Sequence, residues 1–157
     1  MLPIMTLRQT LSFGGLSWQY GRTPVVSTAI KPGKTVVGIT GADNALFGAG
    51  FDTLVGGGGG GDNFFELGRG DRAIAGTGDG IDTITTYFEN VTLPKYFSNG
   101  TLGHAGTITG NTGNNILTVT GSGAHTLRAG TGNDVLVGST SGLAGCRIGV
   151  PVFRIFG

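Results

Sequence analysis

Residues 57–65 read Gly-Gly-Gly-Gly-Gly-Asp-Asn-Phe-Phe, and this stretch is the clearest indication of the fold. It fits a nine-residue template, G-G-x-G-x-D-x-U-x, in which U is a large apolar residue. The glycines let the backbone turn tightly with positive φ angles. The aspartate offers a hard oxygen ligand to a cation, and U points into a narrow core. A repeat of this kind predicts a solenoid fold and a bound metal together, and by itself it does not predict an enzyme.

The same template recurs along the chain in a degenerate form. Residues 47–55 and 129–138 match it well, reading Phe-Gly-Ala-Gly-Phe-Asp-Thr-Leu-Val and Ala-Gly-Thr-Gly-Asn-Asp-Val-Leu-Val-Gly. Poorer units are centred on Asp43, Asp71, Asp82, Asn115 and His125. Successive units are separated by nine residues in some cases and by ten in others, and a slip lies between Asp71 and Asp82, so short insertions interrupt the phase. The template makes Ala45 and Ala73 the apolar residues of their units, which predicts two weak positions in the core.

The composition agrees with a folded repeat. The chain has 33 glycines among 157 residues, 5 prolines and no collagen-like period. Glycine at this level is typical of flexible tracts, but periodic valine, isoleucine, leucine, phenylalanine and threonine between the glycines argue against disorder. A single cysteine, Cys146, excludes an internal disulfide. We therefore expect an all-β chain, a parallel β-roll or β-solenoid built from Gly-Asp turns, with an irregular N-terminal segment and no long helix.

The pattern divides the chain into five segments. Residues 1–36 form an N-terminal strand, cap or linker segment, and residues 37–90 form a first repeat block. Residues 91–106 form a connector that is expected to run over the surface, because it contains a proline and several glycines. Residues 107–140 form a second repeat block, and residues 141–157 form an irregular tail that abandons the repeat.

Charge is distributed unevenly, although the net charge is only +1. Residues 37–90 contain eight acidic side chains and two arginines, whereas residues 1–36 contain four basic side chains and no acidic one. The first block is therefore expected to attract cations. The basic residues at the start are scattered and form no basic-aromatic patch, so nucleic acid is not an expected partner. No run approaches about 20 apolar residues, so no membrane span is expected.

These units resemble the RTX, or haemolysin-type, calcium-binding repeats of secreted bacterial proteins. The resemblance covers roughly residues 38–140, with a gap near 94–106. In that family the Gly-Asp turns alternate on two sides of a right-handed β-roll, and calcium lies between turns two repeats apart. The resemblance implies calcium as the bound ion, held by Asp43 with Asp62, Asp52 with Asp71, Asp62 with Asp82, and Asn115 with Asp134. The full set of expected metal-site residues is Asp43, Asp52, Gly57, Gly59, Asp62, Asp71, Asp82, Asn115, Gly130, Gly132 and Asp134.

Calcium is also expected to be coupled to folding. An ion bound with roughly millimolar affinity would add ~4 kcal/mol per site, and it would neutralise carboxylates that otherwise repel one another across stacked turns. The second block is the weaker one, because Asn115 and His125 stand where the template has aspartate. An imidazole is a poor ligand for a hard cation that prefers oxygen.

The function expected from these features is that of a secreted calcium-binding module. It would act as a scaffold or export-linked segment that folds on meeting extracellular calcium. The start of the chain has no signal-peptide pattern, and RTX-like proteins often use an uncleaved C-terminal signal, so export without a cleavable N-terminal peptide is expected. No acid-base, nucleophilic or catalytic-metal constellation is present, so an enzyme confined to this chain is not expected.

Two alternatives remain open. The first is a carbohydrate-associated accessory module, with a polysaccharide or an attached catalytic domain as partner and with Trp18, Tyr20, Tyr87 and Tyr96 as a stacking platform. The second is an ice-binding or adhesive solenoid. Its threonines would come from the Thr-x-Thr triplets at 83–85, 107–109 and 118–120, although threonine is also simply a good strand former.

Overall fold

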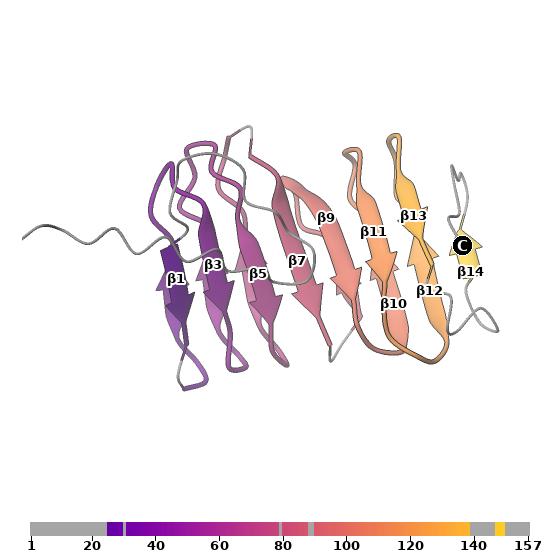
Figure 1. The fold of residues 1–157 in the computed structure, drawn as a ribbon, viewed down its shortest axis with the longest axis horizontal. Coiled ribbons are helices and arrows are strands. Elements are labelled where there is room, and N and C mark those ends of the chain that lie inside the picture. The colour runs from indigo at the N-terminus through magenta and orange to yellow at the C-terminus, as the bar shows by residue number, and fades with distance from the viewer. Residues whose placement is uncertain (1–24, 30, 79, 88–89, 139–146, 150–157) are drawn as a thin grey trace, which may run out of the picture.

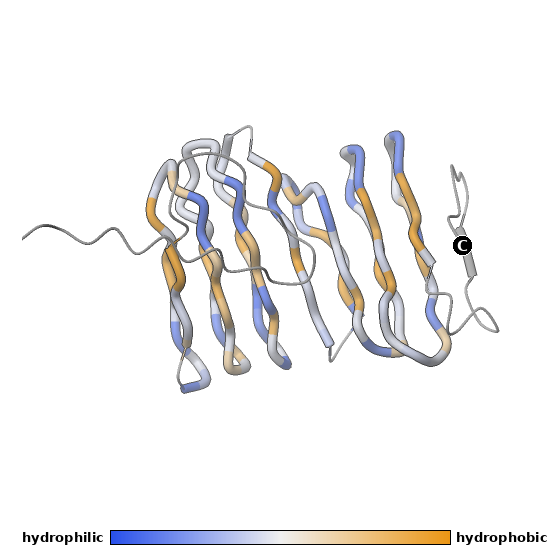
Figure 2. The backbone as a smooth tube through the Cα atoms, viewed as in Figure 1, coloured by the Kyte–Doolittle hydropathy of each residue, from blue (hydrophilic) through white to orange (hydrophobic). Residues whose placement is uncertain are grey.

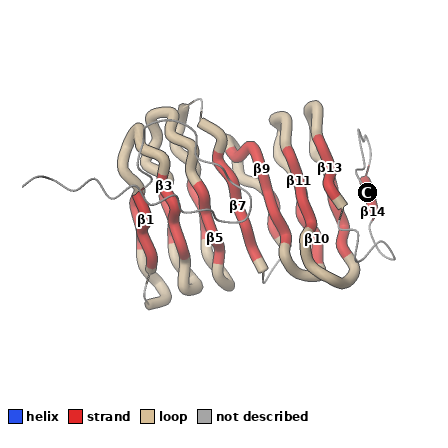
Figure 3. Tube along the Cα trace, in the orientation of Figure 1, coloured by secondary structure: helices blue, strands red, loops and turns tan. Residues whose placement is uncertain are grey.

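A computed structural model describes residues 25–29, 31–78, 80–87, 90–138 and 147–149. Within these ranges all regular structure is β-strand, and short strands alternate with loops (Figure 3). In chain order the strands are β1 (Val25–Thr28), β2 (Thr35–Val37), β3 (Asn44–Phe47), β4 (Thr53–Val55), β5 (Phe64–Leu67), β6 (Arg72–Ile74), β7 (Asp82–Thr86), β8 (Val91–Thr92), β9 (Phe97–Leu102), β10 (Gly106–Thr109), β11 (Ile116–Val119), β12 (His125–Arg128), β13 (Val135–Val137) and β14 (Arg147–Gly149). The described part of the chain contains no helix long and apolar enough to cross a bilayer.

Successive strands alternate between two faces of a solenoid (Figure 1). The odd-numbered strands make one continuous sheet in the order β1-β3-β5-β7-β9-β11-β13. The other face consists of two separate sheets, β2-β4-β6 and β14-β12-β10-β8. Each pair is parallel, because every coil of the chain returns to the same face in the same direction. The predicted all-β, parallel β-solenoid is confirmed.

The coil period is nineteen residues through most of the odd-numbered sheet. Val25 pairs with Asn44, Ala45 with Phe64, Phe64 with Thr83, and Ile116 with Val135. A nineteen-residue coil holds one nine-residue and one ten-residue unit. The mixture of steps in the sequence is therefore a regular property of the coil. It does not reflect random insertions.

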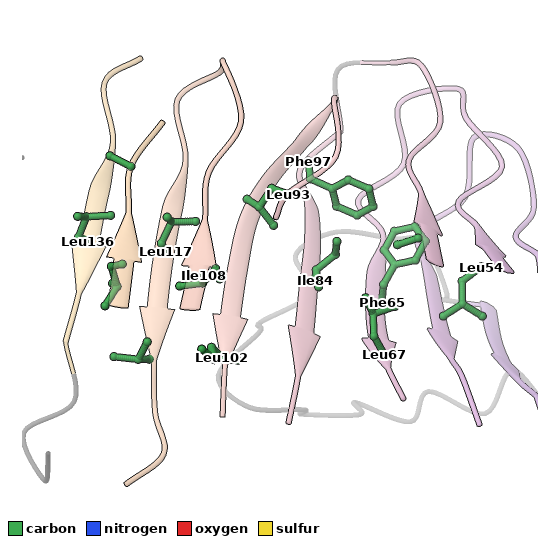
Figure 4. Packing of buried hydrophobic residues seen from close by; sticks show 14 of the residues in the cluster. Leu54, Phe65, Leu67, Ile84, Leu93, Phe97, Leu102, Ile108, Leu117 and Leu136 are labelled. Atoms are coloured by element: carbon green, nitrogen blue, oxygen red, sulfur yellow. The ribbon is translucent and has the colours of Figure 1, made fainter. Parts of the chain in front are cut away.

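The core is a narrow column of apolar side chains that runs along the solenoid axis. Figure 2 shows apolar positions on the strands and polar positions at the turns. The buried cluster comprises Leu46, Leu54, Phe65, Leu67, Ala73, Ile84, Leu93, Phe97, Leu102, Ile108, Leu117, Val119, Leu127, Ala129 and Leu136. Part of it is drawn in Figure 4, where the rings of Phe65 and Phe97 meet edge to face with centroids 5.0 Å apart. Such an arrangement suits aromatic quadrupoles.

In two units, the residue that enters the core is not the one that the template predicts. The template makes Ala45 the apolar residue of its unit, but the large core side chain there is Leu46, which is fully buried. The unit at 57–65 likewise places Phe65 in the core cluster, one residue beyond Phe64. In this block the inward residues are eight and eleven residues apart in turn, as from Leu46 to Leu54 and from Leu54 to Phe65. The inward positions of these two units therefore lie one residue beyond the template position. Ala73 occupies its expected core position.

Residues 91–106 do not form a surface connector, and that expectation was wrong. They contain β8, β9 and the first residue of β10, and Leu93, Phe97 and Leu102 are buried. The coil is shortened here, since Asp82 pairs with Phe97, and an irregularity follows between Asp82 and Thr83. The strand ladder and apolar core therefore continue through a stretch that has lost the template glycines.

Both end segments also contribute to the solenoid. From the segment 1–36, β1 pairs with β3 and β2 pairs with β4, so these strands form the first coil. From the segment 141–157, β14 pairs with β12. Residues 1–24, 139–146 and 150–157 lie outside the described residues, as do Asp79 and Cys146.

Candidate functional site

A column of Asn and Asp side chains lies inside the turns that lead into the odd-numbered strands. We call it the inner column, and its members are Asn44, Asn63, Asp82, Asn115 and Asp134, all of them buried. In the first coils these side chains bond to one another in series. Asn44 Nδ2 donates to Asn63 Oδ1 at 2.7 Å, and Asn63 Nδ2 donates to Asp82 Oδ1 at 2.7 Å. The column joins three consecutive coils through these side-chain hydrogen bonds.

Asp43 and Asp62 lie one residue before the inner column and nearer to solvent. The backbone amide of Asp62 donates to Asp43 Oδ1 at 3.0 Å. The amide of Ile81 donates to Asp62 Oδ1 at 2.7 Å. Each carboxylate thus bonds to the same position of the next coil, nineteen residues away. Charge-assisted bonds of this kind are stronger than bonds between neutral groups.

Asp52 and Asp71 occupy the matching turns on the other face. The amide of Asp52 donates to Asp71 Oδ1 at 2.8 Å, and the amide of Gly68 donates to Asp71 Oδ2 at 2.7 Å. Asp52 accepts the amide of Lys34 at 2.6 Å and that of Ala49 at 2.7 Å, one on each oxygen. Both carboxylates therefore close turns by accepting backbone N–H groups.

The electrostatic state of Asp52 follows from these bonds. Desolvation acts to raise its pKa, but N–H groups of Lys34, Ala49, Gly50 and Gly33 outweigh that effect and lower the pKa below the ordinary value of 3.8. Hydrogen bonds to the charged form favour ionisation. Backbone N–H groups therefore stabilise the negative charge of Asp52.

The second block contains one carboxylate, Asp134. Its Oδ1 accepts the amide of Asn115 at 2.8 Å, and Asn115 Oδ1 accepts the amide of Asn111 at 2.8 Å. Gly130 and Gly132 have φ angles of 91° and 122°, as the tight turn before Asp134 requires. An amide cannot neutralise a cation, so this part of the chain offers less charge to a metal than the first block does.

A small hollow lies between two stacked glycine turns of the first block. It is lined by Gly58, Gly60, Gly61, Asn63, Gly76, Thr77, Gly78, Gly80 and Asp82. The turns pack backbone against backbone, since a Cβ placed on Gly76 would overlap Gly58, and one on Gly80 would overlap the Gly61 carbonyl. Four successive residues, 57–60, have φ between 70° and 85°. Only glycine adopts such a run without strain.

Asp82 is the carboxylate of this hollow. Burial raises its pKa above 3.8, and the nearby charge of Asp62 raises it further, although hydrogen bonds from Asn63 act in the opposite direction. Asp52 and Asp82 thus have opposite pKa shifts, even though both follow Gly-rich turns. A cation in the hollow would relieve both the desolvation and the repulsion at Asp82.

The predicted ligand pairs are brought together in different ways. Asp43 with Asp62, Asp52 with Asp71, and Asn115 with Asp134 are each joined by a carboxylate-to-amide bond across neighbouring coils. Asp62 and Asp82 are offset by one residue, because Ile81 occupies the position paired with Asp62. In the described ranges no group of three or more His, Cys, Asp or Glu side chains gathers in a way that could hold a metal ion.

The sequence reasoning missed Asn44 and Asn63 as site residues. Their signal was present, because an Asp-Asn pair occurs at 43–44 and again at 62–63. The template predicts the first residue of each pair as the ligand, whereas the second residue is the one that lies in the inner column. At the other end, the buried ring of His125 places Nε2 3.0 Å from the Gly121 carbonyl, and its Nδ1 has no hydrogen-bond partner.

Comparison of the chain with family models, with curated proteins and with solved structures finds no match.

Proposed function

We propose that this protein is a secreted calcium-binding module, an RTX-like β-solenoid that serves as a scaffold or export-linked segment. The observation that carries the proposal is the hollow between stacked glycine turns, which Asp82 lines together with glycines of both turns. Calcium takes six to eight oxygen ligands in flexible geometry. Closely stacked glycine turns can present several backbone carbonyls to one ion, and Asp82 supplies a carboxylate.

We place calcium in the first repeat block alone and expect none in the second. Asp52 and Asp71 already have both oxygens bonded to backbone amides, so an ion there would have to displace existing bonds. Asp82 differs because its charge is penalised by burial and by Asp62. We therefore expect one principal site, with Asp43 and Asp62 adding negative potential beside it.

Calcium would act by tying neighbouring coils together. An ion in the hollow would contact the coil that holds residues 57–61 and the coil that holds residues 76–82. Binding to the folded state alone stabilises it by about 1.4 kcal/mol when free calcium is about ten times the Kd. The inner column and the strand ladders join the same coils, so calcium would reinforce contacts between these coils and would favour their folded arrangement.

The test is thermal unfolding, followed by circular dichroism, in chelator and then in ~10 mM calcium or magnesium. The wild type should melt at a higher temperature with calcium and be unchanged by magnesium. Asp82→Asn should lose the calcium shift, whereas Asp134→Asn, at the equivalent position of the second block, should keep it. Absence of any calcium shift in the wild type would reject the proposal, and so would an undiminished shift in Asp82→Asn.

No specific observation favours either of the two alternative functions. Of the aromatic platform, Trp18 and Tyr20 lie outside the described residues, and Tyr96 lines a groove that Tyr87 does not. For the ice-binding alternative, Thr83 and Thr85 are buried and therefore cannot belong to an exposed threonine array. The calcium module remains the function that the site favours.

A further inference from the structure

The even-numbered face of the solenoid is interrupted between β6 and β8. On this face Thr53 of β4 pairs with Arg72 of β6 across a nineteen-residue offset. The same offset would place Val91 beside Arg72, yet β6 ends one sheet and β8 ends the other. On the opposite face β5 and β7 are paired over their length. Among the described residues, therefore, β6 and β8 each have an edge at this interruption that pairs with no strand.

A groove of about 560 Å³ occupies this interruption. Its lining includes the buried core residues Leu67, Ala73 and Ile84, so the groove reaches the apolar interior. Ala73 pairs with Leu54 of the preceding coil and is a much smaller side chain at an equivalent core position. The missing volume at Ala73 leaves room for an apolar group that enters from outside.

The mouth of the groove carries positive charge. Arg72 and Lys95 line it, and both are exposed. Among the described lining residues the only carboxylate is that of Asp71, and it accepts backbone amides with both oxygens. An occupant is therefore expected to carry acidic groups as well as an apolar one.

We infer that this groove binds an extended peptide strand of a partner protein, which pairs with the edges of β6 and β8. Strand edges recognise extended backbone, because they present N–H and C=O groups at strand spacing. The backbone amide of Arg72 points toward β4, where it donates to the Asp52 carbonyl, and that of Leu93 points toward β10, where it donates to the Thr109 carbonyl. Alternation along each strand then directs the amides of Ala73 and Thr92 toward the groove.

The burial pattern of β6 specifies the side chains of the partner strand. Arg72 and Ile74 face outward and Ala73 faces inward. A parallel partner strand in register would place an acidic residue beside Arg72, a large apolar residue over Ala73 and a β-branched residue beside Ile74. A saccharide is the less favoured occupant, because Tyr96 is the only aromatic residue in the described lining, and a sugar would leave the two strand edges unused.

The experiment uses the full chain and a fluorescein-labelled peptide, Thr-Glu-Leu-Val-Thr, titrated by fluorescence anisotropy. We expect saturable binding that weakens at least tenfold in Arg72→Glu. Binding to that variant should be restored when the peptide glutamate is replaced by lysine. Arg128→Glu, an exposed arginine on β12, is the matched control and should bind as the wild type does. Ala73→Leu, which fills the groove from within, should also weaken binding.

Hydrogen exchange supplies a second readout. The peptide should slow exchange of the Ala73 and Thr92 amides and leave the amides of β12 unchanged. The inference is overturned if no saturable binding occurs, or if Arg72→Glu binds as tightly as the wild type. It is also overturned if the Ala73 and Thr92 amides are already protected in the free chain. Binding of an acidic polysaccharide, lost in Tyr96→Ala and without peptide binding, would identify a different occupant.

Discussion

At the scale of single residues, the same residue type serves two purposes in this chain. Asp52 is a structural acceptor of backbone amides, whereas Asp82 carries a charge that its surroundings oppose. Both stand at a Gly-rich turn and look alike in the sequence. The difference arises from neighbours contributed by other coils, namely Lys34 beside Asp52, and Asn63 and Asp62 beside Asp82.

This difference predicts opposite pH dependences for Asp52 and Asp82. The pKa of folded Asp52 is below its unfolded value, so its stabilisation is present above pH ~3.9 and is lost as pH falls through the folded pKa. The pKa of folded Asp82 is above its unfolded value, so the folded state binds the extra proton. Stability from Asp82 therefore falls as pH rises from ~3.9 through the folded pKa.

Urea unfolding in chelator from pH ~3 to ~7 measures both effects, because the unperturbed carboxyl pKa of ~3.9 lies within that range. The stability difference between wild type and Asp52→Asn should grow in favour of the wild type as pH rises. The difference between wild type and Asp82→Asn should move the other way. Constant offsets from altered hydrogen bonds do not affect these slopes. Two slopes of the same sign would contradict the assignment.

At the scale of elements, the glycine turns are as important as the strands. Turns of neighbouring coils stack with their backbones in contact, and this closeness is possible only because the residues lack a Cβ. The requirement is distinct from the need for a positive φ. Gly33 illustrates the need for a positive φ, because its φ is 76° and a Cβ there would meet no other atom. Gly76 illustrates the need for close approach, because a Cβ there would overlap the backbone of Gly58.

We predict that Gly76→Ala destabilises the protein far more than Gly138→Ala. A Cβ at Gly76 would overlap the Gly58 backbone, which cannot move as a flexible side chain can, whereas a Cβ at Gly138 meets nothing within 4 Å. Overpacking of this kind costs about 1–3 kcal/mol. Urea unfolding of the two variants gives the comparison. Equal losses would mean that the turns at 57–61 and 76–80 are not in close contact.

At the scale of the whole molecule, stability is a sum of contacts between neighbouring coils. In a solenoid each coil packs only against the coils before and after it, so a defect remains local. The core residue Phe65 pairs with Leu46 and Ile84 in the adjacent coils and meets the ring of Phe97. Its removal should weaken the middle of the array without a direct effect on the far end.

Phe65→Ala is therefore expected to cost about 3–5 kcal/mol locally, through lost burial and the cavity that remains. Native-state hydrogen exchange should accelerate in β3, β5 and β7 and change little in β11 and β13. Leu136→Ala serves as the reciprocal control, because it should accelerate exchange in β11 and β13 and spare β3. Uniform acceleration in both variants would show that the array unfolds as one cooperative unit.

The fold class could be predicted because it depends on a local rule. Glycines, an Asx residue and an apolar residue two positions later recur in most units, as in Asp52 with Leu54 and Asp134 with Leu136. A pattern that repeats within about ten residues specifies a turn and a short strand wherever it occurs. It therefore predicted the parallel solenoid and core positions such as Leu54, Leu117 and Leu136.

The remaining features depend on which coil lies beside which. Asn44 rather than Asp43 belongs to the inner column, because Asn44 lies in register with Asn63, nineteen residues away. The burial of Phe97 and Leu102 in a stretch without the repeat, and the groove between β6 and β8, accompany two shortened coils. The local turn and the short strand are encoded within a single repeat unit. Register, burial and the open edges depend on contacts between coils, because hydrogen bonds and packing there join residues that no short pattern relates.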